Sequence, residues 1–294
     1  MGALLAETRE LLRRFNLQAR KRLGQHFLID EEMLEVITSA AELSPADVIM
    51  EVGPGLGVLT RELARQAGWV ITIELDSKLA TALKQTLARF DNIAILNENI
   101  LEIVPSALLE EQKARFPREI VNPFGYKVVA NLPYYITSPV LRHFLETSVK
   151  PRIMVVMVQK EVAEAIVAEP GRMSLLSISV QFYGEARIIS YVPARCFYPA
   201  PEVDSAILRV KPYHQPAVAV SDTKIFFELV RAGFTARRKQ IGNSLAQGLR
   251  EPKTDVLPLL EKADIAPQRR AETLTLGEWA RLCRAFTQVE RTAC

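Results

Sequence analysis

The feature that most constrains the fold is an alternation of short apolar segments with helical patterns between residues 48 and 168. Because the apolar segments are hydrophobic on both faces and alternate with helices, they predict a parallel sheet that is covered on both sides. The expected strands are residues 48–52, 69–76, 93–101, 126–136 and 152–159, and the expected helices are residues 31–41, 59–66, 77–90, 138–146 and 160–168. In the helix at 138–146, Ser138 is the expected N-cap and Pro139 the first helical residue.

The pattern changes after residue 176. Residues 177–192 and 205–213 read as strands without a long helix between them, which predicts an antiparallel edge on the parallel sheet. From Pro216 helical patterns dominate, at residues 223–234, 237–249, 256–263 and 276–286. We therefore expect an α/β domain over residues 1–213, with a basic N-terminal segment 1–30, and a smaller all-helical domain over residues 214–294.

Composition excludes several classes of protein. The 294 residues carry a net charge of only +3, and the three cysteines and three histidines have no metal-ligand spacing. No apolar run approaches the ~20 residues of a membrane span. The first 15 residues form an amphipathic pattern with Glu7 and Glu10, which indicates a helix and not a signal peptide. We expect a cytoplasmic protein without a metal site.

A glycine loop follows the first strand of the alternation. EVGPGLG places Gly53, Gly55 and Gly57 between a strand and a helix, where glycines allow a tight turn and close approach of a ligand. The dinucleotide fingerprint needs a further glycine at Val58, so NAD is disfavoured. The E-x-G-x-G-x-G spacing that starts at Glu51 instead matches loops that bind S-adenosylmethionine. A glycine turn without a ligand is the alternative.

Polar residues end the next two strands. Glu74 can accept hydrogen bonds from both ribose hydroxyls of such a cofactor, and Asp76 is a competing candidate. After the third strand, Asn99 is the candidate for contact with the adenine, with Asn97 and Glu98 as rivals. A solvated loop is the alternative for this third position.

The stretch NLPYY ends the fourth strand, at the sheet edge where open α/β sheets bind ligands. The exocyclic amine of a base is a poor nucleophile, because its lone pair is delocalised into the ring. The side-chain oxygen of Asn131 and the carbonyl of Leu132 can accept its N–H groups and favour a pyramidal nitrogen. Pro133 restricts Leu132 to an extended conformation, and Tyr134 offers a stacking face for the base. A turn with core tyrosines is the alternative.

Taken together, the motifs resemble the ribosomal RNA adenine dimethyltransferase family, and within it the small-subunit (16S) enzymes. The resembling segments are KRLGQHFLID at 21–30, EVGPGLGVLT at 51–60, IELD at 73–76, NLPYYITSP at 131–139, FYPAPEVDSAILRV at 197–210 and FFELVRAGFTARRKQIGNSL at 226–245. The resemblance implies a Rossmann-like class I methyltransferase sheet and S-adenosylmethionine as cofactor, with S-adenosylhomocysteine as product.

The resemblance also implies roles for single residues. His26 and Leu28 fall where the family contacts the cofactor, although asparagine is more frequent at position 26. Gly53, Gly55 and Glu74 match the glycine-loop and ribose positions, and Asn99 stands where the family usually has aspartate. Asn131 matches the catalytic asparagine, and Phe197 the aromatic that the family places against the target adenine. A plain core aromatic is the alternative for Phe197.

Two basic clusters remain. Arg237, Arg238 and Lys239 fall in one helical stretch, and Arg20, Lys21 and Arg22 lie near the N-terminus. A solvated helix face is the usual meaning of such a run, but the pair fits two patches that bind RNA phosphates. The target adenines must be unstacked, or lie in a loop, before the amine can be reached.

The resemblance therefore implies an enzyme that dimethylates N6 of two adjacent adenosines in a 3′-terminal hairpin loop of 16S rRNA, within an immature small subunit. A monomer is expected. The alternatives are a large-subunit (23S) rRNA dimethylase that confers macrolide resistance, a non-catalytic RNA-binding assembly factor, and a DNA adenine methylase. The intact glycine loop and NLPY motif argue against lost chemistry, and nothing in the sequence resembles a separate domain for DNA target recognition.

Overall fold

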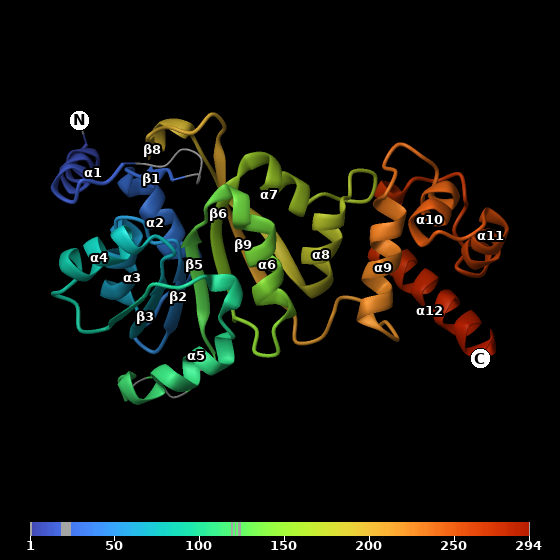
Figure 1. The fold of residues 1–294 in the computed structure, drawn as a ribbon, viewed down its shortest axis with the longest axis horizontal. Helices are drawn as coiled ribbons and strands as arrows, with labels where there is room; N and C mark the ends of the chain where they lie inside the picture. The colour runs from blue at the N-terminus through green and yellow to red at the C-terminus, as the bar shows by residue number, and fades with distance from the viewer. Residues whose placement is uncertain (1, 19–24, 119, 121, 123–124, 294) are drawn as a thin grey trace. The chain divides into compact units, whose positions relative to one another are not determined.

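We describe a computed structural model of the chain, which covers residues 2–18, 25–118, 120, 122 and 125–293. The chain divides into two compact units (Figure 1). The first comprises Met1–Ala163 and Ala186–Pro212, and the second Glu164–Glu185 and Tyr213–Cys294. The predicted boundary after residue 213 lies one residue from the last of these junctions. Residues 164–185, which we had placed in the first domain, group with the second.

A seven-stranded sheet in the order β4-β3-β2-β5-β6-β9-β7 forms the centre of the first unit. Neighbouring strands from β4 to β6 pair in parallel, and β9 pairs antiparallel to β6. The strands are β2 (Val48–Val52), β3 (Trp69–Ile73), β4 (Ile93–Leu96), β5 (Lys127–Asn131), β6 (Met154–Gln159), β7 (Gly184–Val192) and β9 (Ser205–Pro212). This confirms the mostly parallel sheet with an antiparallel edge.

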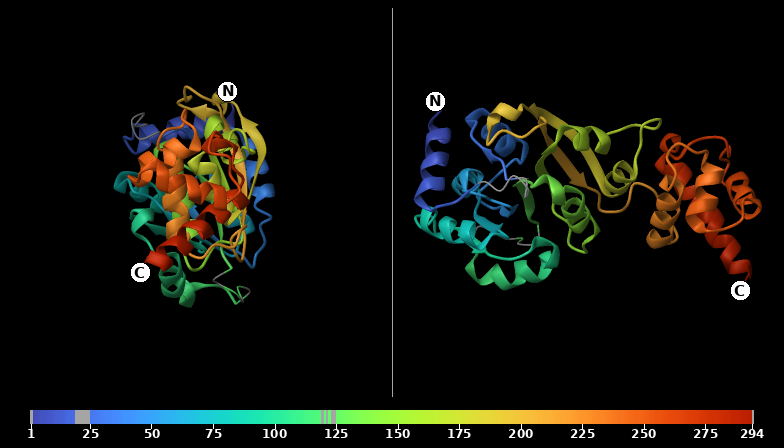
Figure 2. Two further views of the ribbon diagram at one scale, coloured as in Figure 1. Left: turned by 90° about the vertical axis from the view of Figure 1, so that its right-hand side faces the viewer. Right: turned by 45° about the horizontal axis from the view of Figure 1, so that its top comes forward.

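Helices cover both faces of this sheet (Figures 1 and 2). Successive residues of β5, Val128 and Val129, point to opposite faces and are both fully buried, as a two-sided cover requires. Val129 lies in one core with Leu34 of α2 and Leu63 of α3. The helices of this unit are α1 (Ala3–Arg14), α2 (Glu31–Ala40), α3 (Val58–Gln66), α4 (Ser77–Thr86), α5 (Pro105–Gln112), α6 (Thr137–Glu146) and the start of α7 (Lys160–Ile166).

A short second sheet ties the N-terminal segment to a later loop. β1 (Phe27–Leu28) pairs antiparallel with β8 (Phe197–Tyr198), so that Leu28 lies opposite Phe197. The pairing brings residues 25–28 to the end of the sheet where the glycine loop begins, because Phe27 contacts Gly55 of that loop. Three sequence motifs therefore meet here: the N-terminal segment, the glycine loop and the segment that contains β8.

A buried ion pair lies at the opposite ends of the strands, away from the glycine loop. Lys127 at the start of β5 donates to Asp47, just before β2, at 2.8 Å, and also to the carbonyl of Glu42. The side chains of Lys127 and Asp47 are only 5% and 3% exposed. Removing one partner of such a pair would leave a buried charge without compensation, which is strongly destabilising. Because the pair lies where β2 and β5 begin and the glycine loop follows the end of β2, its role is structural.

The second unit is a helical domain with its own core. Its helices are α8 (Leu175–Tyr183), α9 (Thr223–Phe234), α10 (Ile241–Leu249), α11 (Lys253–Lys262) and α12 (Leu276–Ala293). Phe226 of α9 stacks on Phe182 of α8 with ring centroids 4.7 Å apart, and both are fully buried. This packing explains why residues 164–185 group with the helical unit.

Two sequence-based predictions are wrong, one for residues 177–183 and one for the start of α6. Residues 177–183, expected as a strand, form most of α8, because Ser174 and Ser177 build a capping box that begins a helix. The β-branched and aromatic residues that suggested a strand are used for helix packing instead. The expected N-cap Ser138 lies inside α6, since the 3₁₀ turn at Tyr134–Ile136 runs directly into a helix that begins at Thr137.

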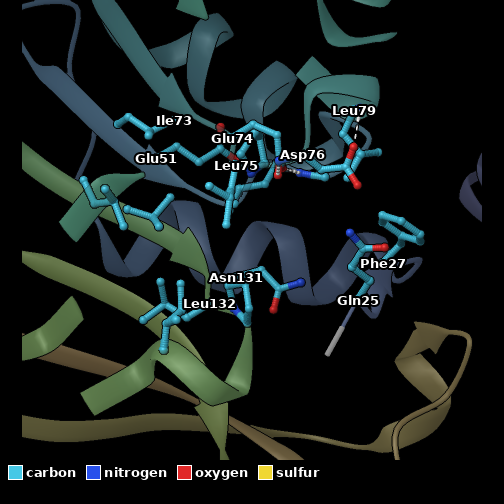
Figure 3. A pocket seen from close by; sticks show the side chains of 18 of the residues that line it. Gln25, Phe27, Glu51, Ile73, Glu74, Leu75, Asp76, Leu79, Asn131 and Leu132 are labelled. Atoms are coloured by element: carbon cyan, nitrogen blue, oxygen red, sulfur yellow. Dashed lines mark hydrogen bonds between the residues drawn. The ribbon is translucent and has the colours of Figure 1, made fainter. Parts of the chain in front are cut away.

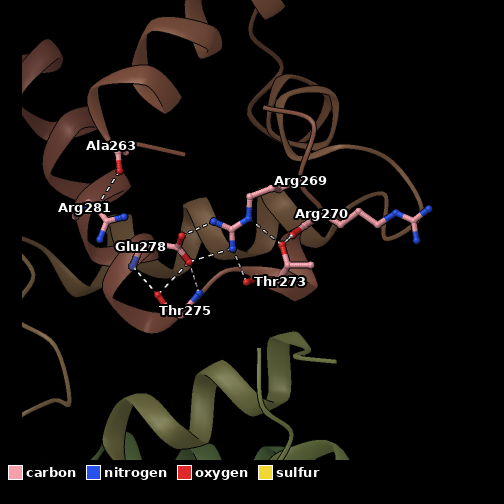
Figure 4. A network of polar contacts seen from close by, with 7 residues as sticks. All are labelled: Ala263, Arg269, Arg270, Thr273, Thr275, Glu278 and Arg281. Carbon is pink, nitrogen blue, oxygen red and sulfur yellow. Dashed lines mark hydrogen bonds and ion pairs between the residues drawn. The ribbon is translucent and has the colours of Figure 1, made fainter. Parts of the chain in front are cut away.

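A polar network links the loop around Arg269 to the start of α12 (Figure 4). Arg269 forms a bidentate ion pair with Glu278 and donates to the carbonyl of Thr273. The same loop supplies backbone acceptors to the N-terminus of α10: Ile241 N–H donates to the carbonyl of Arg269, and Gly242 N–H to that of Pro267. Carbonyls here satisfy helix N–H groups that have no partner within the helix.

Candidate active site

The glycine loop joins β2 to α3 with the backbone in the left-handed region. Gly53 has φ +66° and Gly55 has φ +60°. A Cβ atom on Gly55 would lie 3.1 Å from the Phe27 ring, and one on Gly53 would lie 3.2 Å from Pro133. Glycine is therefore required here both by conformation and by the close approach of two other motifs.

Glu74 follows the end of β3 and is only 6% exposed. Its carboxylate accepts hydrogen bonds from Gly55 N–H at 3.3 Å and from Asp76 N–H at 2.9 Å. Burial raises the pKa of Glu74 above its usual range. The rival Asp76 caps α4 by accepting from Lys78 and Leu79 N–H. Glu74 thus links the glycine loop to the end of β3, while Asp76 stabilises the start of α4 as its N-cap.

Glu51, to which the sequence analysis gave no role, lies beneath the loop. It is 1% exposed, and its Oε2 has no hydrogen-bond partner among the described residues. Burial raises its pKa to about 8, and the nearby negative charge of Glu74 adds to this, while the neighbouring hydroxyls of Thr60 and Thr72 act in the opposite direction. A buried carboxyl oxygen without a hydrogen-bond partner is a signal that only the structure provides, because it depends on what surrounds the residue.

The end of β4 contributes Asn99, the N-cap of the 3₁₀ turn Ile100–Glu102. Its side-chain oxygen accepts from Leu101 N–H at 3.1 Å, and its amide donates to Glu102 at 2.8 Å. The rival Asn97 instead donates to the carbonyls of Glu74 and Leu75, so it shapes the turn that carries Glu74. Asn99 and Glu98 line the cavity described below.

Asn131 is the last residue of β5, opposite Met157 of β6. Its side-chain amide donates to the carbonyl of His26 at 3.1 Å, which orients the side chain. None of the described residues donates a hydrogen bond to its side-chain oxygen, which thus keeps its acceptor capacity. Leu132 N–H donates to the Met157 carbonyl at 3.2 Å, so the next peptide is also fixed by β6.

His26 contacts two other motifs, NLPY and the loop after β8. Besides accepting from Asn131, it stacks its ring on Tyr134 with centroids 5.7 Å apart and planes at 27°. Its Nδ1 lies 2.7 Å from the Pro199 carbonyl. Because a carbonyl can only accept, Nδ1 carries the proton. The histidine at a position where the family more often has asparagine thus connects the N-terminal segment, NLPY and the loop after β8.

Phe197 is not brought to this site. It is 3% exposed, belongs to the same core as Leu34 and Leu63, and lies outside the cavity lining as the structure describes it. The β1–β8 pairing directs its side chain into the core, which is the alternative that the sequence left open. Its direct contact with a target adenine is therefore not supported by this arrangement.

One cavity of about 360 Å³ gathers most of the predicted residues (Figure 3), a size typical of small-molecule sites. Asn131 lies across this cavity from Glu74 and Asp76. The predicted residues that line it are His26, Leu28, Gly53, Gly55, Glu74, Asn99, Asn131, Leu132 and Tyr134. Two buried carboxyl groups, Glu51 and Glu74, line the same space and favour a ligand that carries positive charge and hydroxyl groups. S-adenosylmethionine fits this requirement, since it carries a sulfonium, an ammonium and a ribose.

The predicted basic residues lie elsewhere. Arg20, Lys21 and Arg22 lie outside the described residues. Arg237, Arg238 and Lys239 are exposed but, contrary to the sequence-based expectation, lie in the turn between α9 and α10 and not in a helix. Ser244 fixes this turn by donating to the Ala236 carbonyl at 3.0 Å. Gln240, directly after the basic run, becomes the N-cap of α10.

Within the described part of the chain, no group of three or more His, Cys, Asp or Glu side chains is arranged to hold a metal ion. None of its helices is both long and apolar enough to cross a membrane.

The mostly parallel sheet and this cavity define an α/β methyltransferase that uses S-adenosylmethionine. The model of the family described as ribosomal RNA adenine dimethylase matches residues 16–288. The chain belongs to this family.

Individual relatives agree with the family match. A ribosomal RNA small subunit methyltransferase A from Dehalococcoides mccartyi is 50% identical over 287 residues, covering 97% of this chain and 94% of that protein. The crystal structure of the 23S rRNA methyltransferase ErmE aligns with a TM-score of 0.66 and 29% identity, covering 89% of this chain and all of that one. A dimethyladenosine transferase from Plasmodium falciparum aligns with a TM-score of 0.71 over 90% of this chain and 98% of that one, and its 23% identity shows the fold alone.

Proposed function

We propose that the protein transfers methyl groups to the N6 amines of two adjacent adenosines near the 3′ end of 16S rRNA, in the cytoplasm and during assembly of the small ribosomal subunit. The observation that carries the chemistry is the oriented Asn131, whose side-chain oxygen is left as an acceptor beside the cavity. The 50% identity to a small-subunit enzyme over nearly the whole chain supports the choice of RNA.

The chain's own residues account for positioning of the substrate. The cofactor, when bound, supplies an electrophilic methyl group on a sulfonium. Asn131 Oδ1 and the Leu132 carbonyl accept the two N–H groups of the adenine amine, which directs its lone pair toward the cavity. Tyr134 stacks on the base. Holding the two reactants in line supplies most of the rate enhancement. Transfer of the methyl group would release S-adenosylhomocysteine and leave the amine as a cation, which gives up its proton readily to water, so no side chain is needed as a strong general base.

The test is mass spectrometry of RNA after incubation with immature small subunits and S-adenosylmethionine. We expect two adjacent N6,N6-dimethyladenosines in 16S rRNA and none in 23S rRNA offered in parallel. The structural likeness to ErmE makes the large-subunit enzyme the second candidate. Methylation confined to 23S rRNA would establish that candidate and refute our proposal.

We further propose that the turn at residues 237–239 binds RNA phosphates. Replacing Arg237, Arg238 and Lys239 together by alanine is expected to weaken binding to immature subunits roughly 10- to 100-fold at physiological salt. Because each lost phosphate contact removes about one unit from the slope of log affinity against log salt concentration, the slope should fall by ~2–3. Filter binding at several salt concentrations measures both.

A charge-matched control comes from the same helical unit. Lys224, Lys253 and Lys262 are also exposed, and their triple alanine variant removes the same net charge. Equal weakening in both variants would show that only overall charge matters and would contradict a specific role for the turn. Cofactor affinity should be unchanged in both.

A further inference from the structure

Ser205 is a buried polar residue at the start of β9 that no step above uses. It is fully buried, and its Oγ lies 2.7 Å from the hydroxyl of Tyr134. In the sheet it lies opposite Gln159, the last residue of β6. Ser205 therefore lies at the same end of the sheet as Asn131, and its hydrogen bond joins β9 to the turn after β5.

This contact fixes the outer end of the tyrosine ring. The face of the ring is held by His26, whose own position is set by its hydrogen bond to Pro199. The hydroxyl is held by Ser205. A tyrosine side chain has two rotatable bonds, and a ring fixed at one face and at its tip retains little freedom in either. Tyr134 is therefore oriented before any substrate arrives.

The environment of the hydroxyl also favours this bond. Burial raises the pKa of Tyr134 above its usual value, the hydrogen bond with Ser205 acts in the opposite direction, and the nearby negative charges of Asp204 and Glu161 add to the rise. The phenol therefore keeps its proton over the physiological range. A buried hydroxyl that loses its partner is unfavourable, so the ring would shift to recover a hydrogen bond elsewhere.

We propose that Ser205 is a positioning residue for methyl transfer, which holds the Tyr134 ring in the orientation that stacks the target adenine beside Asn131. The inference rests on the proposed function and deepens it. Ser205 does not touch the reacting atoms. It acts through Tyr134, and its loss allows the ring to rotate while cavity, cofactor contacts and Asn131 remain in place.

The expected effect is on turnover and not on binding. Small misplacements of reacting groups reduce rates by up to ~100-fold without removing the groups themselves. Ser205→Ala is expected to lower kcat about 10-fold and to change the KM for cofactor and for RNA less than twofold. Tyr134→Phe should lower kcat by a similar factor. This variant keeps the stacking ring and removes the hydroxyl that is the partner of Ser205.

The double variant provides the decisive measurement. Because Ser205→Ala and Tyr134→Phe break one and the same interaction, the double variant should lose no more activity than either single variant. Multiplied losses, near 100-fold, would show that the two residues act separately and would overturn the proposal. Full activity of Ser205→Ala would overturn it as well.

Two further variants separate positioning from general destabilisation. Ser205→Cys keeps the volume with a weaker hydrogen-bonding group, and its kcat should fall between those of wild type and Ser205→Ala. Tyr126→Phe removes a hydrogen bond from another buried tyrosine, to the Val149 carbonyl at 3.1 Å, and should leave kcat unchanged. If Tyr126→Phe loses as much activity as Tyr134→Phe, the effect is one of stability and the proposal fails.

The wild-type protein is assayed beside every variant. Absence of any RNA methylation by wild type would refute the proposed function itself. Methylation by wild type that persists unchanged in Ser205→Ala would refute only the positioning role. Thermal unfolding of each variant shows whether its folded fraction is the same.

Discussion

Replacing Asn131 by alanine should abolish methyl transfer, with a loss of at least ~1,000-fold in kcat, while cofactor binding persists. The residue supplies one of two acceptors for the amine, and removal of a single preorganised hydrogen-bonding group at a reacting centre costs about 10²–10³ in rate. Here the loss is at the upper end, because the His26 carbonyl also loses its donor and the amine is no longer oriented. Single-turnover assays and cofactor titration by calorimetry measure the two properties separately.

A matched control is Asn92, whose side chain donates to the carbonyls of Ala64 and Ala67 just before β4. Asn92→Ala removes two hydrogen bonds at the far end of the strands. We expect it to lower the melting temperature and to leave the rate per folded molecule intact. Substantial transfer by Asn131→Ala, within tenfold of wild type, would rule out the acceptor role and favour a contribution to RNA binding alone.

Much of this site could be predicted because parallel strands end at one edge of a sheet. Once the strand–helix alternation was read from residues 48–168, Gly53, Glu74 and Asn131 had to meet at that edge, and the structure places all three around one cavity. The glycine spacing and the missing glycine at Val58 further separated S-adenosylmethionine from NAD. These are local sequence patterns, which can be recognised without knowing how distant segments of the chain pack.

What could not be predicted depends on contacts between distant segments. The direction of Phe197 follows from the β1–β8 pairing, which joins residues 169 or more positions apart. The strand-like composition of residues 177–183 concealed a capping box at Ser174. Ser205, His26 and Tyr134 form a unit only in three dimensions. Contacts between residues so far apart in the sequence cannot be recognised from it, because each residue taken alone is also typical of a strand end or a turn.

Glu51→Gln should stabilise the cofactor-free protein, increasingly so as pH rises. The folded-state pKa of Glu51 is about 8, above the ordinary value of 4.5, so the folded state holds a proton that the unfolded state gives up. Below pH 4.5 the carboxyl is protonated in both states and costs nothing. Between about pH 4.5 and 8 the wild type loses about 1.4 kcal/mol of unfolding free energy per pH unit through this group, and above pH 8 the loss is constant.

Glutamine cannot ionise, so the difference between variant and wild type isolates this group from all others. The difference should grow from near zero at pH 4.5 to roughly 3–5 kcal/mol at pH 8. Urea unfolding at several pH values measures it. Glu110→Gln, at an exposed position, serves as the control and should show no such trend. A difference that is independent of pH would mean that Glu51 is already ionised in the folded protein.

The same group should couple cofactor binding to proton release. A ligand that brings positive charge beside Glu51 lowers the pKa of that carboxyl, so at pH 7 the wild type should release close to one proton on binding S-adenosylmethionine. Calorimetry in phosphate and Tris buffers, whose ionisation enthalpies differ, counts that proton. Glu51→Gln should bind more weakly and release almost none. Equal proton release by both proteins would assign the proton to Glu74, the other buried carboxyl of the cavity, because its raised pKa makes it the next group to titrate.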